Sequence, residues 1–130
     1  MKPYSLLPGL LACLFAVPAA AADQACLFQG MMHDNGIRQV VHYCLSNQGV
    51  SAADFRTYCG ELNAAHGAGA TRAAASPIPM KYLASCPGTP RGRCDQAFGE
   101  KLALLYMGDD YTLKNGYAKL FCQSMDGKWK

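Results

Sequence analysis

Six cysteines follow residue 22, and their even number constrains the fold more than any other feature of the sequence. They are Cys26, Cys44, Cys59, Cys86, Cys94 and Cys122. The stretch that holds them has only about 108 residues. A chain of this size buries a limited share of its surface on folding, so the apolar core alone gives it only marginal stability. We therefore expect the six to form structural disulfides, each typically worth ~2–5 kcal/mol in a domain of this size.

Residues 1–22 have the pattern of an export signal. Lys2 gives a positive start, residues 10–17 give a short apolar run, and an alanine-rich exit predicts cleavage near Ala22. The run is shorter than the ~20 apolar residues that a membrane-spanning helix needs. The short signal and small size favour a bacterial protein that is periplasmic or secreted, without a transmembrane segment, in a compartment where disulfides persist.

A different processing route would make the protein a lipoprotein anchored at Cys13, the seventh cysteine, with residues 10–13 as the cleavage box. This interpretation is disfavoured, because Pro8 and Gly9 interrupt the preceding residues and the longest apolar run follows the cysteine.

The charge balance argues against a nucleic-acid partner. Without the predicted signal, 11 Lys and Arg residues face 9 Asp and Glu residues, a net charge of 11 − 9 = +2. A dedicated nucleic-acid binder normally carries a strong basic stripe, whereas these cations are spread along the chain.

Apolar residues at helical spacing occur in several segments. The first set predicts an amphipathic helix and consists of Ile37, Val40, Val41, Cys44 and Leu45. A second helix is predicted to begin at Ser51, which with Asp54 forms a capping box, and to bury Phe55 and Cys59. The short connection between the two helices predicts an antiparallel hairpin.

The second half of the chain has weaker helical patterns. One or two turns are expected over Met80–Cys86, a third helix over Cys94–Tyr106, and a last helix over Leu113–Met125 capped by Asp109 or Asp110. Between the halves, residues 63–76 are rich in Ala and Gly and predict a mobile connector. The expected fold is therefore a mostly α, small disulfide-stabilised domain over residues 23–130: a helical hairpin plus two or three further helices.

Cysteine parity ties the two halves together. Three of the six cysteines precede the connector and three follow it, so complete pairing requires at least one bridge between the halves. Residues 23–130 should therefore be a single domain. Fifteen pairings remain open on this argument; the first local guess is Cys86 with Cys94, across a turn rich in Pro and Gly.

Catalytic and cofactor motifs are absent from the sequence. It contains no Cys-x-x-Cys pair, no zinc-binding His-Glu-x-x-His, no Gly-x-Ser-x-Gly and no phosphate-binding glycine loop. We assign no catalytic residue and no cofactor on this basis.

One local cluster suggests a periplasmic copper-binding protein as an alternative. Met31, Met32 and His33 supply thioether and imidazole groups, a ligand set suited to soft metals. The simpler interpretation places the methionines in the core and His33 in a turn, and no metal site is assigned.

A small secreted hydrolase is a second alternative. His33-Asp34 resembles the histidine–aspartate pair of the secreted phospholipases A2, which implies a water-activating imidazole and a calcium-binding carboxylate. The resemblance covers two residues. Met31, Met32 and Asn35 stand where that motif has cysteines, and its glycine-rich calcium loop has no counterpart.

The favoured hypothesis is a non-enzymatic binding or accessory protein that acts on another envelope or secreted protein. The expected contact surfaces are residues 64–75 and the turn at 87–93, because exposed loops on a rigid scaffold often carry function. The aromatic residues Tyr106, Tyr111, Tyr117 and Trp129 are expected mostly in the core, with a few available to anchor a partner.

Overall fold

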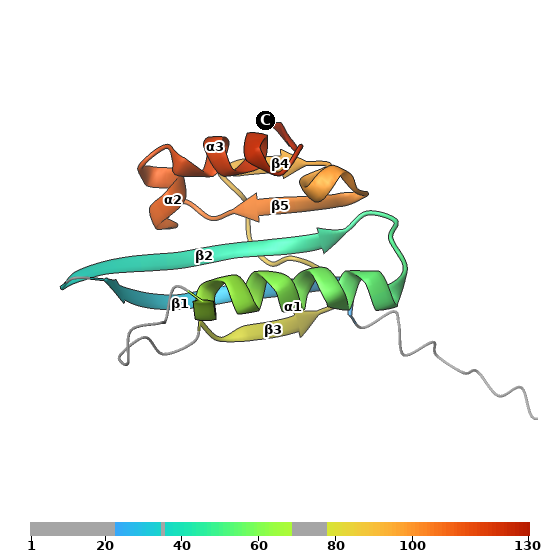
Figure 1. Cartoon of the computed structure of the whole chain (residues 1–130), viewed down its shortest axis with the longest axis horizontal. Helices are drawn as coiled ribbons and strands as arrows, with labels where there is room; N and C mark the ends of the chain where they lie inside the picture. The colour runs from blue at the N-terminus through green and yellow to red at the C-terminus, as the bar shows by residue number, and fades with distance from the viewer. Residues whose placement is uncertain (1–22, 35, 69–77) are drawn as a thin grey trace, which may run out of the picture.

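The computed structural model describes residues 23–34, 36–68 and 78–130, which form one six-stranded antiparallel sheet with helices (Figure 1). The strands are β1 (Ala25–Asp34), β2 (Ile37–Asn47), β3 (Met80–Leu83), β4 (Gly92–Asp95), β5 (Leu102–Tyr106) and β6 (Lys128–Trp129). Their order across the sheet is β3-β1-β2-β5-β4-β6. The helices are α1 (Ala52–Ala68), α2 (Tyr111–Lys114), α3 (Tyr117–Ser124) and the 3-10 turn η2 (Ala97–Gly99).

The predicted mostly helical fold is therefore wrong, and the largest error is the first helix. Residues 37–45 lie in β2, which forms a hairpin with β1. Asp34 pairs with Ile37 across a tight turn in which Gly36 has a φ of 80°. Val41 and Tyr43 are buried on one face of β2 and Cys44 on the other, so the apolar residues mimic a helical stripe.

The helices predicted over Met80–Cys86 and Cys94–Tyr106 are also wrong. The first segment contains β3, and the second contains β4, η2 and β5. In β5, Leu102, Ala103 and Leu104 are buried in succession, as in a strand covered on both faces. Such a continuous apolar run has no clear periodicity of its own.

Two predicted helices are confirmed. The Oγ atom of Ser51 accepts a hydrogen bond of 3.1 Å from the N–H of Asp54 at the start of α1, where Phe55 and Cys59 are fully buried. The C-terminal helix is present as α2 and α3, separated at Gly116, which has a φ of 76°.

The predicted connector at 63–76 is only partly described. Residues 63–68 continue α1, so this part of the prediction is wrong. The remainder of the connector, the predicted signal and Cys13 lie outside the described residues.

Helices α1 and α3 cover the same face of the sheet. The main core cluster joins Phe55 of α1 and Ala118 of α3 to Phe28, Leu45 and Leu104 of three strands. The opposite face has a smaller cluster around Ala25, Leu27 and Cys44, packed against Leu83 and Cys86. The domain thus has two layers, with the larger core between the sheet and the helices.

Three disulfides crosslink the domain, and two of them join the sheet to the helices. Cys26–Cys59 links β1 to α1, Cys94–Cys122 links β4 to α3, and Cys44–Cys86 links β2 to the segment after β3. The last bridge confirms the prediction of a crosslink between the halves, whereas the predicted Cys86–Cys94 pair is wrong. No helix within the described ranges is both long enough and apolar enough to span a membrane.

The bridge between β4 and α3 leaves no space beside it. A Cβ atom on Gly127 would lie 2.3 Å from the Sγ atom of Cys94 and 2.9 Å from that of Cys122. Because a disulfide cannot rotate away as a surface side chain can, any larger residue at 127 must displace the backbone.

Gly127→Ala should therefore lower the free energy of unfolding by about 1–3 kcal/mol, the usual cost of overpacking. Gly60→Ala is the matched control, because its Cβ would meet nothing within 4 Å and Ala favours a helix over Gly by roughly 0.5–1 kcal/mol. Urea unfolding under non-reducing conditions measures both changes. Equal stabilities for the two variants would contradict this packing.

Candidate functional site

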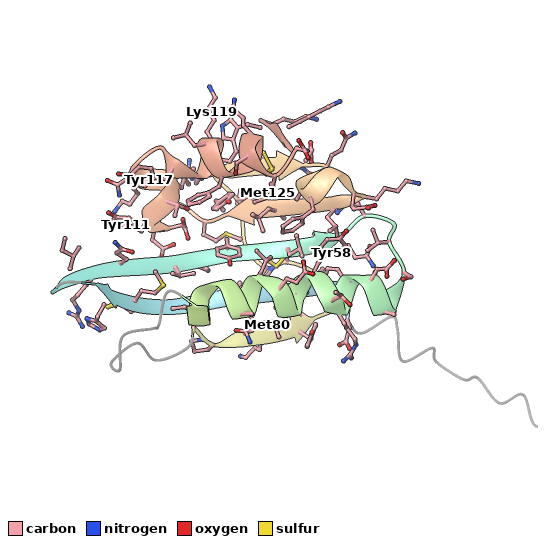
Figure 2. All side chains as sticks on the ribbon, viewed as in Figure 1. Tyr58, Met80, Tyr111, Tyr117, Lys119 and Met125 are labelled. Carbon is pink, nitrogen blue, oxygen red and sulfur yellow. A yellow bond between two sulfur atoms is a disulfide. The ribbon has the colours of Figure 1, made fainter. Side chains whose placement is uncertain are left out.

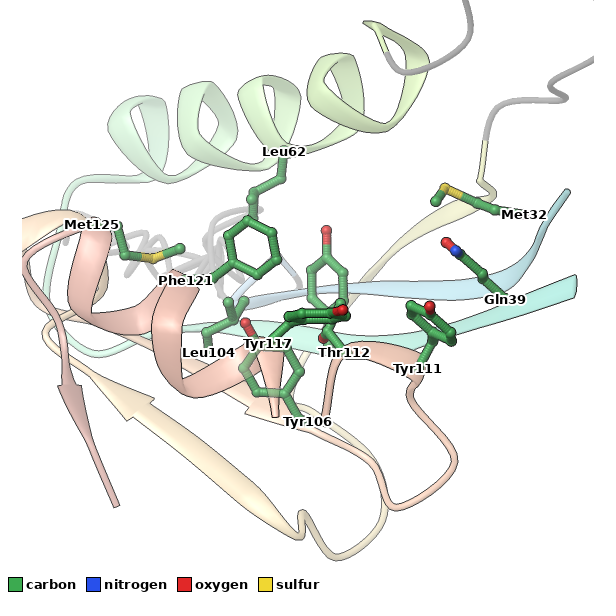
Figure 3. Close-up of a pocket in the computed structure, with 11 residues that line it drawn as sticks. Met32, Gln39, Leu62, Leu104, Tyr106, Tyr111, Thr112, Tyr117, Phe121 and Met125 are labelled. Carbon is green, nitrogen blue, oxygen red and sulfur yellow. The ribbon is translucent and has the colours of Figure 1, made fainter. Parts of the chain in front are cut away.

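A groove opens between α1 and α3 over the helix-covered face of the sheet, with a cavity volume of about 630 Å³ (Figure 3). It is lined by Met32, Gln39, Tyr43, Leu62, Leu104, Tyr106, Tyr111, Thr112, Tyr117, Phe121 and Met125. We call it the aromatic groove because five of these side chains are rings. Its volume falls within the range of about 300–1,000 Å³ that is typical of ligand sites.

The floor of the aromatic groove comes from the sheet. Tyr43 of β2 and Tyr106 of β5 are cross-strand partners, with ring centroids 5.8 Å apart. Phe28 of β1 stacks on the other side of Tyr43 at 4.9 Å. Because residues directly opposite on paired strands share a face, the register of these strands fixes the positions of the rings.

The walls come from the helices. Leu62 extends from α1 and Phe121 from α3, and Met125 directly follows the last residue of α3 (Figure 3). Tyr111 and Tyr117, the first residues of α2 and α3, have ring centroids 6.4 Å apart. Tyr117 and Phe121 remain 47% and 53% exposed, so the α3 wall presents large apolar side chains to solvent.

Asp110 anchors the segment that carries this second pair of tyrosines. Its carboxylate is 1% exposed and accepts hydrogen bonds from the N–H groups of His42, Thr112 and Leu113. It also accepts a bond of 2.5 Å from the Thr112 hydroxyl. These bonds cap α2 and attach its first turn to β2, which places Tyr111 at the end of the aromatic groove.

The two floor tyrosines are held in their neutral form. Burial raises the pKa of Tyr43 and of Tyr106 above the ordinary value, and the charge of Asp110 raises both further. No side chain that lines the aromatic groove carries a formal charge at neutral pH. The groove therefore offers aromatic and aliphatic surface with a few hydroxyl and amide groups.

Ionisation of these phenols should destabilise the fold. A pKa raised on folding contributes stability below the unfolded value and loses it as pH rises toward the folded value, so stability should fall above about pH 10. Tyr43→Phe removes one of the two groups and should show a smaller loss between about pH 8 and 11. Urea titrations at each pH test this, and an identical pH dependence in wild type and Tyr43→Phe would contradict it.

The structure separates the residues predicted for soft-metal binding. Met31, Met32 and His33 are consecutive in β1, where successive side chains point to opposite faces. Met31 and His33 are exposed, whereas Met32 is partly buried and lines the aromatic groove. The strand thus does not bring the three donors together.

The predicted histidine–aspartate pair lies at the end of the same strand. His33 is exposed, and its cross-strand partner is Arg38. The side chain of Asp34 lies outside the described residues.

A different His–Asp pair is present that sequence reasoning missed. The Nδ1 atom of His42 lies 2.7 Å from an oxygen of Asp109, across 67 positions of sequence. Asp109 is exposed, so this contact lies at the surface. Among the described residues, no three His, Cys, Asp or Glu side chains are close enough to hold a metal ion.

Of the two predicted contact surfaces, the turn at 87–93 contributes no residue to the lining of the aromatic groove. Residues 64–68 continue α1 and residues 69–75 lie outside the described ranges. Residues 87–93 form a largely exposed segment that ends in β4, where Gly92 is buried.

A second, polar depression lies beside β4 and β6. It contains Arg93, Asp95 and Lys130, and its volume is about 410 Å³. Asp95 pairs with both cations, and the hydrogen bonds from Arg93 and Lys130 lower the pKa of its carboxyl group. The lining carries four cations and two carboxylates, a net charge of 4 − 2 = +2. Because Arg93 and Lys130 are well exposed and already paired with Asp95, the depression is a weak candidate for an anion site.

Comparison of the chain with known protein families, curated proteins and solved structures gave no match.

Proposed function

We propose that this is an exported, non-enzymatic binding or accessory protein whose aromatic groove binds another envelope or secreted protein. The observation that carries the proposal is the exposed α3 wall. Tyr117 and Phe121 face solvent at the rim of a cavity whose interior is already apolar. Aromatic side chains in such positions commonly dominate the energy of protein interfaces.

The energy available at the rim is substantial. Burying apolar surface yields about 25 cal/mol per Å², and taking a large aromatic side chain from full exposure to full burial contributes roughly 1.5–3 kcal/mol. Because Tyr117 and Phe121 are about half exposed, covering each of them contributes about half of that. Leu120, which is 61% exposed, adds a further apolar side chain beside the rim. Soluble monomers seldom expose such side chains together unless the patch is functional.

The lining favours binding over catalysis. General acid–base chemistry near neutral pH needs a group whose pKa lies close to 7. The polar groups in the aromatic groove are the amide of Gln39, the hydroxyl of Thr112 and phenols, and burial moves the pKa of Tyr43 and Tyr106 further from neutrality. These groups can orient a ligand by hydrogen bonding.

The covalent structure supports the proposed compartment. Three disulfides are consistent with an extracellular or periplasmic protein, because reducing compartments keep thiols free. Export through the predicted signal at 1–22 and a bacterial source are part of the proposal. The expected partner accordingly belongs to the envelope or is secreted.

Site-specific photocrosslinking in the producing cells tests the proposal. A benzoylphenylalanine at Phe121, inside the aromatic groove, should give one dominant covalent adduct with an envelope or secreted protein. The same group at Lys119 is the control, because this exposed side chain points away from the sheet on the outer side of α3 (Figure 2).

The adduct at position 121 should disappear when Tyr117→Ser is added, because this change removes aromatic surface from the rim. Unfolding curves of the purified variants establish that the fold persists. Adducts of the same identity and yield at 119 and 121 would overturn the proposal, as would an adduct at 121 that is unaffected by Tyr117→Ser.

A further inference from the structure

Strand β2 extends beyond the strand beside it. It pairs with β1 from Ile37 to Ser46, nearly its whole length, but with β5 only from Tyr43 to Asn47. Figure 1 shows the hairpin of β1 and β2 projecting past the end of β5. On the β5 side, residues 37–41 therefore form a sheet edge that no described strand pairs with.

The direction of the backbone groups on this edge follows from His42. Its C=O accepts a hydrogen bond of 3.0 Å from Met107, and its N–H donates one of 2.8 Å to Asp110, so both groups point away from β1. Backbone groups alternate in direction along a strand, so those of Arg38 and Val40 point the same way. No described residue outside β2 pairs with them on this side.

This edge opens directly onto the aromatic groove. Gln39, between the two outward-pointing residues, has its side chain in the groove lining together with its cross-strand partner Met32. Arg38 is exposed and lies on the other face of the strand. The edge carries no proline, and its one charged side chain, Arg38, lies on the face away from the aromatic groove, so it has little of the usual protection against strand addition.

We propose that the partner binds as an added β-strand: an extended segment pairs with β2 at Arg38–Val40, in the row that β5 occupies further along. The inference rests on the proposed function and names how the partner is recognised. The partner residue opposite Gln39 points into the aromatic groove and is apolar or aromatic. The residue opposite Arg38 lies on the other face and is acidic, since opposite charges are favourable cross-strand pairs.

Backbone pairing supplies part of the affinity and the groove supplies selectivity, as in other cases of strand addition. α2 begins beside this edge, where Asp110 binds His42, and so limits the added strand at one end. The segment that pairs is therefore short, about three to five residues, which suits an exposed loop or terminus of a partner protein.

The test uses a phage-displayed library of random eight-residue linear peptides, selected on the intact oxidised protein. Val40→Pro removes the outward N–H at position 40, and proline is tolerated on an edge where that N–H faces solvent. Val40→Ala is the matched control, because it shortens the side chain and keeps the N–H. Selected peptides should bind Val40→Pro about tenfold more weakly than wild type, with little change in Val40→Ala.

Amide hydrogen exchange gives a second measurement that needs no variant. The N–H of Val40 should exchange rapidly in the free protein and slowly with peptide bound. The N–H of Val41 points toward β1, where this residue is paired with Gly30, and should be protected in both states. If Val40→Pro fails to fold, the exchange rates of the Val40 and Val41 N–H groups, with and without peptide, test strand addition in the wild type.

The outcomes separate this inference from the proposed function. Binding that Phe121→Ser abolishes but Val40→Pro leaves unchanged would overturn strand addition while leaving the aromatic groove as a binding site, as for a small apolar ligand. Dimers of the wild type that Val40→Pro dissolves would assign the edge to a second copy of the chain and also overturn it. A library that enriches no peptide would contradict it as well.

Discussion

Two of the three disulfides hold helices α1 and α3 against one face of the sheet, and the aromatic groove exists because of where they attach. Cys26–Cys59 fixes α1 over β1, and Cys94–Cys122 fixes α3 over β4. The strands β2 and β5 lie between these two attachment strands. Neither attached helix therefore covers the central residues of β2 and β5, and the rings of Tyr43 and Tyr106 form the floor of an open groove. A domain this small gains much of its stability from such bridges.

Local capping and cysteine parity were predictable from the sequence, whereas the fold class was not. Ser51 and Asp110 cap helices because hydroxyl and carboxylate groups before an apolar run satisfy the first free N–H groups, an interaction that needs no tertiary context. The strand β2 was misassigned because both of its faces are apolar in part, so a helical period fits as well as an alternating one. Asn35-Gly36 was the signal that could have corrected this, since this dipeptide is typical of two-residue hairpin turns.

The candidate site was less accessible to sequence reasoning than the fold. Its floor and walls come from three separate strands, α1 and the α2–α3 segment, and only tertiary pairing brings Tyr43 beside Tyr106. The sequence indicated Tyr106, Tyr111 and Tyr117 as mostly core residues with a few possible anchors. The contact surface was predicted in loops instead, because binding residues often lie on exposed loops. A strand edge leaves no mark in composition, and only the unequal lengths of β2 and β5 reveal it.

The most direct test of this account is the disulfide connectivity, determined by peptide mapping of the purified protein without reduction. The account predicts three crosslinked peptide pairs: Cys26 with Cys59, Cys44 with Cys86, and Cys94 with Cys122. A Cys86–Cys94 peptide, or free thiols at these positions, would contradict it. Loss of Cys26–Cys59 or of Cys94–Cys122 would remove the covalent attachment of α1 or α3 to the sheet, and the aromatic groove would lose the constraint that shapes it.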